Sequence, residues 1–188
     1  MPTSKLDQLR DRFIENFKRI EMNTTRGDAT FLRIMIESTR AKRGLEIGTA
    51  TGYGAIQMGF GFEKNGGKLI SIDPDPQMVK TARNNIIKVK LHETVSFIEG
   101  DALAVMPTLK GKFDFVFIDA IKEDYLKYLR AIEPKLKLGS VIVADNVIRF
   151  SNKMKDFLDT VLNDPNYRTV VIRASEEKGD GMTVSYRI

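Results

Sequence analysis

Short, continuously apolar runs alternate with longer helical patterns through the middle of this chain, and this alternation constrains its fold more than any other feature. Five such runs are expected as strands, at residues 44–47, 68–72, 95–98, 113–118 and 141–144. The helical patterns between them fall near residues 53–62, 75–90, 102–110 and 122–135. Because strands that are apolar on both faces need cover on both faces, the alternation predicts a parallel sheet between two layers of helices.

The two ends of the chain extend this pattern. Helices are expected over 4–20 and 28–41, and a further helix near 151–163. Two last strand-like segments, 168–174 and 182–188, are expected to form an antiparallel hairpin at one edge of the sheet. The sequence therefore predicts an α/β fold: a single doubly wound, Rossmann-like domain over residues 1–188 with a mostly parallel seven-stranded sheet.

The composition narrows the class of protein. With 188 residues and no repeat or Pro/Ser-rich linker, the chain is expected to form one domain. The absence of Cys excludes disulfides and thiolate metal sites and fits a cytoplasmic protein. No apolar segment approaches the roughly 20 residues that span a bilayer, and the charged N-terminus does not resemble a secretory signal. The net charge of +5 would suit an anionic substrate or RNA, but the basic residues are scattered, which favours an ordinary solvated surface.

Acidic side chains stand at the carboxyl ends of nearly all the expected parallel strands. In chain order they are Glu46, Asp73, Glu99 with Asp101, Asp119, and Asp145 with Asn146. Ligands of a doubly wound sheet bind beyond these strand ends, where the topology changes direction. Helix capping explains one or two such residues, since Asp and Asn also begin helices. The whole set predicts a cleft lined by carboxylates, which suits a cofactor and a cation and not a bare phosphate.

The segment LEIGTATGYGA (45–55) follows a strand and opens a helix, so its glycines can admit a ligand close to the backbone. Gly48, Gly52 and Gly54 give the spacing G-x-x-x-G-x-G, which is not the G-x-G-x-x-G of dinucleotide binders. Glu46 would place a negative charge where a pyrophosphate lies. An NAD-linked oxidoreductase is therefore disfavoured, and the sulfonium of S-adenosylmethionine fits. Asp73 matches an acid that accepts hydrogen bonds from a ribose. Functionless turns are the alternative for both segments.

Seven segments in order carry a resemblance to a known family. They are MNTTRGDATFL (22–32), LEIGTATGYGA (45–55), SIDPDP (71–76), IEGDAL (98–103), FDFVFIDAIKEDYLKYL (113–129), VIVADNV (141–147) and GDGMTVSYRI (179–188). In these segments the chain resembles class I S-adenosylmethionine-dependent methyltransferases. Among them it is most similar to the cation-dependent O-methyltransferases, which include the catechol and caffeoyl-CoA enzymes.

The resemblance implies a set of cofactor contacts. Met22 and Thr24 match a stretch that closes over the cofactor, and the N-terminal helices (1–41) are expected to cover its site. The implied contacts extend from the methionine portion through the ribose to the adenine. In chain order they are Met22, Thr24, Glu46, Gly48, Gly52, Gly54, Asp73, Asp101, Ala102 and Asp119.

The resemblance also implies a divalent-cation site and a base. Asp119, Asp145 and Asn146 match the family's ligands for Mg²⁺, or for another divalent cation such as Mn²⁺ or Ca²⁺, and Lys122 matches the lysine proposed as the general base. Two carboxylates and one amide oxygen leave room in an octahedral shell for two vicinal oxygens of a catechol. A bound cation would acidify the hydroxyl and favour a neutral Lys122 by like-charge repulsion. The alternatives are a surface lysine and purely structural turns.

Departures from the family pattern leave the methyl acceptor open. Gly54 stands where the cofactor loop often has Ser, and VIRFSNK (147–153) lacks the long loop that grips coenzyme A in the plant enzymes. A CoA thioester is therefore not expected. Glu176 or Glu177 is the candidate for the acidic side chain that fixes the second hydroxyl of a catechol.

Three functions remain open from the sequence. The leading prediction is a Mg²⁺-dependent O-methyltransferase, a homodimer without membrane contact, that acts on a small hydroxylated aromatic compound with vicinal oxygens. The alternative within the same chemistry is a tRNA 5-hydroxyuridine O-methyltransferase, for which Arg149, Lys153 and Lys155 would supply a basic stripe at the cleft mouth. The third is a non-catalytic module that only binds the cofactor.

Overall fold

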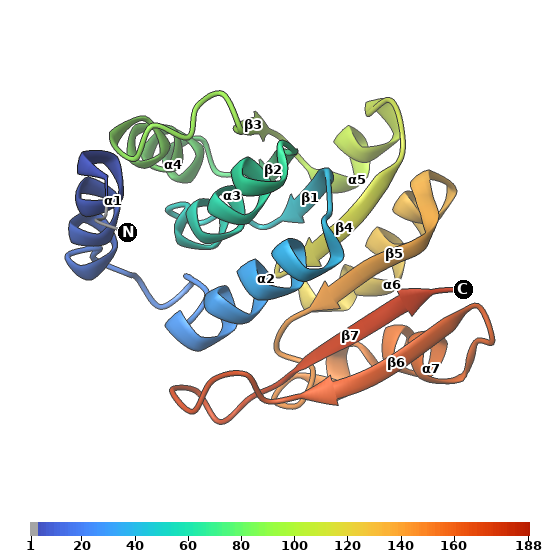
Figure 1. The fold of residues 1–188 in the computed structure, drawn as a ribbon. Helices are drawn as coiled ribbons and strands as arrows, with labels where there is room; N and C mark the ends of the chain where they lie inside the picture. The colour runs from blue at the N-terminus through green and yellow to red at the C-terminus, as the bar shows by residue number, and fades with distance from the viewer. Residues whose placement is uncertain (1–3) are drawn as a thin grey trace.

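The computed structural model describes residues 4–188, and their strands form one seven-stranded mixed sheet (Figure 1). The strands are β1 (Arg43–Ile47), β2 (Lys68–Asp73), β3 (Val95–Glu99), β4 (Phe113–Ile118), β5 (Leu136–Ala144), β6 (Tyr167–Ile172) and β7 (Met182–Arg187). Their order across the sheet is β3-β2-β1-β4-β5-β7-β6. Strands β1 to β5 pair in parallel, and β7 lies antiparallel between β5 and β6. The predicted mostly parallel sheet with a C-terminal antiparallel hairpin is therefore confirmed.

Helices fill the connections between the strands. They are α1 (Lys5–Glu15), α2 (Arg26–Thr39), α3 (Tyr53–Asn65), α4 (Pro76–Lys88), α5 (Ala102–Val105), α6 (Tyr125–Ile132) and α7 (Lys155–Asn163). Residues 1–3, where the predicted domain and its N-terminal cover begin, lie outside the described part of the chain. No helix among the described residues is long and apolar enough to cross a bilayer.

The first helix is shorter than the predicted span of 4–20. It ends at Glu15, where both the backbone N–H and the side-chain Nδ2 of Asn16 donate to the Arg12 carbonyl, at 3.2 and 2.8 Å, and cap the helix. The apolar spacing beyond this point belongs to a connecting segment, residues 16–25, which crosses the molecule towards α2. This ending matters because it releases the segment to line the site described below.

Strand β5 is longer than predicted and begins at Leu136 instead of residue 141. Gly139 in LKLGS suggests a loop, but it adopts a φ of 86° within the strand, and the register of β4 against β5 shifts at the same level. The hydroxyl of Ser140 donates to the Phe113 carbonyl at 2.7 Å and holds the irregular stretch to β4. The helices predicted near 102–110 and 122–135 are shorter than predicted. The first ends in a short 3₁₀ turn that contains Pro107, and the second ends in one that contains Pro134.

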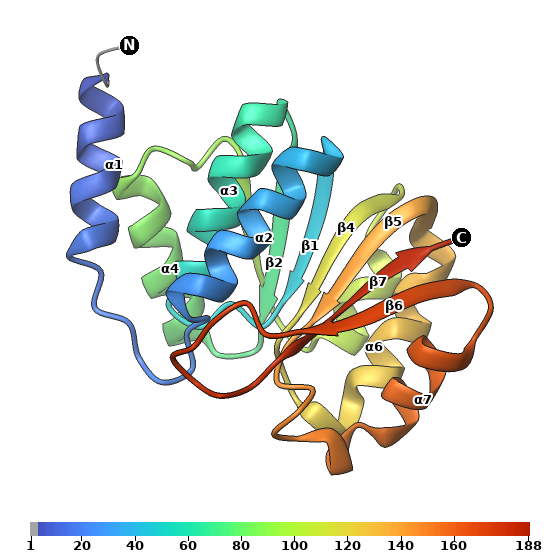
Figure 2. The same ribbon diagram turned by 60° about the horizontal axis from the view of Figure 1, so that its bottom comes forward.

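The sheet is buried between two helical layers (Figures 1 and 2). Helices α2, α3 and α4 pack on one face together with alternate strand residues such as Phe115 and Phe117. Helices α5, α6 and α7 pack on the other face with the intervening residues, such as Val116 and Ile118. Because successive strand side chains point to opposite faces, a continuous apolar run supplies both cores at once. The strand ends remain free to build a site at one edge.

Candidate active site

A cavity of about 990 Å³ lies beyond the carboxyl ends of the parallel strands, as expected for a doubly wound sheet. Its wall includes the residues that follow β1, β2, β3, β4 and β5, together with the segment between α1 and α2. Most of the residues predicted for the site line this cavity: Met22, Thr24, Gly48, Asp73, Asp101, Ala102, Asp119, Lys122, Asp145 and Asn146. Glu46, Gly52 and Gly54 do not line it. The fold thus brings the predicted cofactor, cation and base residues to one place.

The loop after β1 is built by a close approach of two backbones. Gly48 has a φ of 95°, and a Cβ at this position would lie 2.0 Å from the carbonyl oxygen of Asp119. Only glycine fits there, so the loop after β1 runs directly beside the end of β4. Gly52 has a φ of 87° and caps the N-terminus of α3. A Cβ on Gly52 would press against Ala82 of α4 at 2.9 Å, so this glycine serves packing and not the cavity.

Asp73 fixes the shape of the loop after β1 (residues 48–52), which we call the cofactor loop. One of its carboxylate oxygens accepts hydrogen bonds from the backbone amides of Thr49 and Ala50, at 2.9 and 3.0 Å, and the other accepts from the Asp75 amide at 2.9 Å. Each carboxylate oxygen has two acceptor positions, so one position remains for a hydroxyl donor of a ligand, on the oxygen that accepts from Asp75. The acid expected to bind a ribose therefore also orders the loop beside it.

Glu46 takes a different position from the one the sequence suggests. Its side chain is buried behind the loop, 1% exposed, and accepts a hydrogen bond from the Ser71 hydroxyl. Burial raises its pKa to about 8, with smaller contributions from the Asp119 and Asp73 carboxylates. At neutral pH this pKa favours the protonated form of Glu46. Its role as a cofactor contact stays a prediction.

Gly54 explains how Glu46 can be packed so tightly. A Cβ at position 54 would lie 2.8 Å from a carboxyl oxygen of Glu46 and 3.1 Å from the hydroxyl of Thr24. A side chain at position 54 would therefore have to displace the Glu46 carboxyl group or the Thr24 hydroxyl from this packing. Gly54 contributes to the site indirectly, by admitting Glu46 and Thr24 beside the start of α3.

The segment before α2 is tied to the cofactor loop by a residue that the sequence analysis missed. The side-chain oxygen of Asn23, a buried residue, accepts hydrogen bonds from the Thr51 hydroxyl at 2.8 Å and from the Ile20 amide at 3.0 Å. Met22 beside it is 61% exposed and lines the cavity. These contacts hold residues 19–25 as one wall of the cavity. Whether the N-terminal helices cover a bound cofactor stays a prediction.

Lys122 lies at the opposite wall. Its Nζ is 2.8 Å from a carboxylate oxygen of Asp119 and donates to the hydroxyl of Tyr125 at 3.0 Å. Tyr125 in turn donates to the backbone carbonyl of Asp145 at 3.1 Å. Burial, reinforced by the carboxylates of Asp119 and Asp145, raises the pKa of Tyr125 well above its ordinary value, so the phenol stays protonated. Sequence reasoning missed Tyr125, although it stands three residues after the lysine.

The Asp145-Asn146 pair closes the site at the end of β5. Asn146 adopts a left-handed conformation with a φ of 64°, which Asn tolerates better than most residues. Its backbone N–H donates to the Asp145 carboxylate at 2.7 Å. Both oxygens of that carboxylate also accept from the ammonium of Lys178, at 2.5 and 2.7 Å. Burial and the neighbouring Asp119 raise the pKa of Asp145 against the opposing effect of this lysine.

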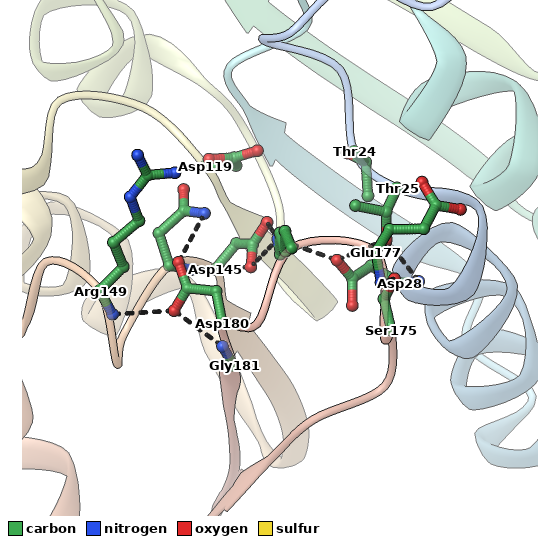
Figure 3. Close-up of polar contacts among 12 residues, drawn as sticks. Thr24, Thr25, Asp28, Asp119, Asp145, Arg149, Ser175, Glu177, Asp180 and Gly181 are labelled. Carbon is green, nitrogen blue, oxygen red and sulfur yellow. Dashed lines mark hydrogen bonds and ion pairs between the residues drawn. The ribbon is translucent and has the colours of Figure 1, made fainter.

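Asp180, labelled in Figure 3, orients the side-chain amide of Asn146. One of its carboxylate oxygens accepts from the Asn146 Nδ2 at 3.2 Å, which turns the amide oxygen of Asn146 away from this contact. The other oxygen accepts from the backbone amides of Arg149, Ile148 and Gly181, at 2.9, 3.1 and 2.8 Å. Burial alone would raise the pKa of Asp180, but these hydrogen bonds outweigh it and lower the pKa below its ordinary value.

The candidate cation site combines two carboxylates with a side-chain amide. Among residues 4–188, no three His, Cys, Asp or Glu side chains gather into a metal-binding cluster. The set predicted from the sequence contains two carboxylates, of Asp119 and Asp145, and the amide of Asn146, and all three line the cavity. Hard cations prefer such oxygen donors, and the contact with Asp180 leaves the amide oxygen of Asn146 available. The donor set therefore fits Mg²⁺, and the assignment stays a prediction.

Comparison with known proteins places this geometry in context. A family model described as O-methyltransferase matches residues 2–187. The chain is 38% identical over 123 residues to a catechol O-methyltransferase of Niastella koreensis, across 63% of this chain and 55% of that protein. The chain spans about half to two thirds of the length of the curated relatives it matches.

Solved structures share the whole fold. A cofactor-bound protein from MTB has a TM-score of 0.85 at 26% identity, and the match covers 98% of this chain and 90% of that one. An O-methyltransferase from Bacillus cereus in complex with SAH has a TM-score of 0.84 at 23% identity, over 100% of this chain and 93% of that chain. These matches agree with the observed order of strands and helices.

Proposed function

This chain belongs to the O-methyltransferase family, and we propose that it transfers the methyl group of S-adenosylmethionine to a hydroxyl of a small, catechol-like aromatic compound. The proposed reaction uses a bound divalent cation, and Mg²⁺ is the first candidate. One observation carries the proposal. The wall of a single cavity presents the loop after β1, two carboxylates and an amide suited to a cation, and the side-chain nitrogen of Lys122 beside them. The catechol specificity of the similar Niastella koreensis protein supports the choice of acceptor.

The cofactor end of the cavity is assigned to the residues after β1, β2 and β3. Asp73 would accept hydrogen bonds from ribose hydroxyls, and Asp101 with Ala102 would flank the adenine. The structural relative that contains SAH, the demethylated form of the cofactor, supports this choice. When bound, S-adenosylmethionine supplies an electrophilic methyl group on a sulfonium. The task of the protein is to align that methyl group with the acceptor oxygen, since orientation is the main requirement of such a displacement.

The cation end is assigned to Asp119, Asp145 and Asn146. When bound there, a divalent cation would lower the pKa of an acceptor hydroxyl and fix two vicinal oxygens. The ligands come from the ends of two adjacent strands, so the sheet itself sets their separation. Asn146 presents its oxygen because Asp180 holds the amide nitrogen. The chemistry of these donors suits Mg²⁺ and also Mn²⁺ or Ca²⁺.

Lys122 is assigned as the group that takes the proton of the acceptor hydroxyl. Its Nζ lies 2.8 Å from Asp119, so a hydroxyl bound beside that carboxylate falls within reach of it. Tyr125 fixes the position of the Nζ by accepting a hydrogen bond at 3.0 Å. Met22, Arg149 and Phe150 line the same cavity and would surround the acceptor ring. Glu177, a candidate for holding the second hydroxyl, also lines the cavity but is paired with Arg19 at 2.7 Å.

A methyl-transfer screen tests the proposal. Radiolabelled S-adenosylmethionine is offered with catechols, caffeoyl compounds and unmodified tRNA, each with added Mg²⁺ and each with EDTA. We expect labelled catechol-type products that are lost in EDTA and restored by Mg²⁺. Labelling of tRNA alone would refute the small-molecule acceptor, and full activity in EDTA would refute the cation assignment. The expected homodimer and cytoplasmic location stay predictions.

A further inference from the structure

Lys178 occupies a position that the proposed function would give to a cation. Its Nζ lies 2.5 and 2.7 Å from the two carboxylate oxygens of Asp145 and 2.8 Å from a carboxylate oxygen of Asp28. The side chains of Asp145 and Asp28 are only 1% and 2% exposed, and that of Lys178 is 19% exposed. A buried ion pair of this kind is poorly screened by solvent and salt, so it is a strong local constraint.

The three partners come from distant parts of the chain. Asp145 follows β5 and Asp28 lies in the first turn of α2, as Figure 3 shows. Lys178 belongs to the loop between β6 and β7. Asp28 is itself fixed, because the hydroxyl of Thr25, the N-cap of α2, donates to its carboxylate at 2.7 Å. Burial alone would lower the pKa of Lys178, but the carboxylates of Asp145 and Asp28 outweigh it and raise the pKa, so the group is an ammonium at neutral pH.

We propose that Lys178 is an internal cation that neutralises Asp145 when no divalent ion is bound, and that its displacement to Asp28 sets the affinity of the site for the divalent ion. The inference rests on the proposed function, since it assumes that Asp145 is a cation ligand. The Lys178 ammonium occupies an acceptor position on each oxygen of Asp145, so it opposes a divalent ion at this carboxylate both by contact and by like charge. Asp28 then keeps the displaced ammonium paired within the protein.

The geometry implies opposite effects for the two partners of Lys178. Removing the ammonium leaves Asp145 free for a divalent ion and removes a like charge from its side, so affinity rises. Removing the carboxylate of Asp28 takes away the place to which the ammonium retreats, so Lys178 holds Asp145 more persistently and affinity falls. A purely structural ion pair would lower protein stability in both variants without this difference in sign.

Mg²⁺ binding measured by calorimetry, and the rise in melting temperature caused by Mg²⁺, provide readouts that do not depend on activity. We expect Lys178→Met to bind Mg²⁺ about tenfold more tightly than the wild type and to show a larger Mg²⁺-dependent rise in melting temperature, since ligand binding stabilises the folded state by mass action. Lys178→Arg should stay close to the wild type. Lys64→Met, which removes an exposed ion pair with Glu37, is the matched control and should leave Mg²⁺ binding unchanged.

A second pair of variants guards against a failure to fold, because Lys178→Met leaves two buried carboxylates without a counter-ion. Asp28→Asn should bind Mg²⁺ more weakly than the wild type. The double variant Asp28→Asn/Lys178→Met keeps the net charge of the wild type and should bind Mg²⁺ more tightly than Asp28→Asn.

Two results would overturn the inference, and they are distinguishable. Equal or weaker Mg²⁺ binding without Lys178, in a chain that still transfers methyl groups in a Mg²⁺-dependent way, overturns the role of Lys178 and leaves the proposed function intact. No Mg²⁺ binding by any variant overturns both the role of Lys178 and the cation part of the proposed function.

Discussion

Replacing Asp180 by Asn should reverse the orientation of the Asn146 amide, and the expected size of the effect follows from the hydrogen bonds of Asp180. Three backbone amides, of Ile148, Arg149 and Gly181, converge on one carboxylate oxygen, while the Asn146 Nδ2 alone donates to the other. An Asn at position 180 keeps one oxygen, which the three amides will hold. Its NH₂ group must then face the NH₂ group of Asn146.

Two consequences follow from this clash of donors. With Asn146 in its present orientation, one hydrogen bond is lost and a buried donor is left unpaired, which lowers the free energy of unfolding by up to about 1–3 kcal/mol. Asn146 can relieve the clash by rotating its amide, which presents NH₂ to the cavity instead of oxygen. Because a supporting partner of a metal ligand contributes roughly 10- to 100-fold to affinity, Mg²⁺ binding should weaken by at least about tenfold.

Urea unfolding and Mg²⁺ calorimetry measure both consequences. The exchange variant Asn146→Asp/Asp180→Asn restores a donor facing an acceptor at unchanged net charge, and it should recover most of the lost stability and affinity. Asp159→Asn, at an exposed position paired with Lys155, is the matched control and should change neither. Normal Mg²⁺ binding by Asp180→Asn, or an exchange variant no better than the single variant, would refute the reasoning.

Further predictions concern Glu46, Tyr125 and Gly48. The pKa of Glu46 is about 8 in the folded state and 4.5 in the unfolded state. Between these values the folded state binds the extra proton, so the free energy of unfolding falls as pH rises, by roughly 1.4 kcal/mol per pH unit. Urea unfolding should show Glu46→Gln gaining stability relative to the wild type as pH rises through this range, and parallel curves would contradict this. Tyr125→Phe removes the acceptor that fixes Lys122, and should lower kcat about tenfold without changing the calorimetric Kd for S-adenosylmethionine; an unchanged kcat would exclude a positioning role. Gly48→Ala and Gly66→Ala both place Ala at positive φ, but only the Ala at position 48 meets a backbone oxygen, at 2.0 Å. Thermal melts should therefore show a cost of about 1 kcal/mol for Gly66→Ala and no stable fold for Gly48→Ala. Equal melting temperatures would show that the loop after β1 can move away from the end of β4.

The sequence determined the sheet and the location of the site. Apolar runs such as 141–144 are too short for helices and too uniform for a half-exposed strand, so they predict buried parallel strands, and the structure confirms them. Parallel strands that end at one edge also bring their following residues together, so the sequence alone assigns Asp73, Asp119 and Asp145 to one cleft, and all three line the cavity. Both conclusions rest on the period of the side chains and on the direction of the strands, which are local properties.

Exact element ends depended on contacts that local patterns do not contain. The apolar spacing of residues 4–20 continues past Glu15, yet Asn16 ends the helix and the chain turns towards the cavity. Gly139 lies inside β5, because pairing with β4 and the Ser140 hydrogen bond outweigh its preference for a loop.

The charge states and partners within the site were decided by the tertiary structure alone. Glu46 is an acid in the sequence, but complete burial makes it mainly a neutral one at pH 7. Lys178 and Asp180 stand in EEKGDG as ordinary polar residues, and the hairpin formed by β6 and β7 carries them across more than thirty positions to Asp145 and Asn146. Hydrogen bonds and electrostatic energies depend on distance and burial in space. Which side chains carry the chemistry was therefore readable from the sequence, whereas what holds them in place was not.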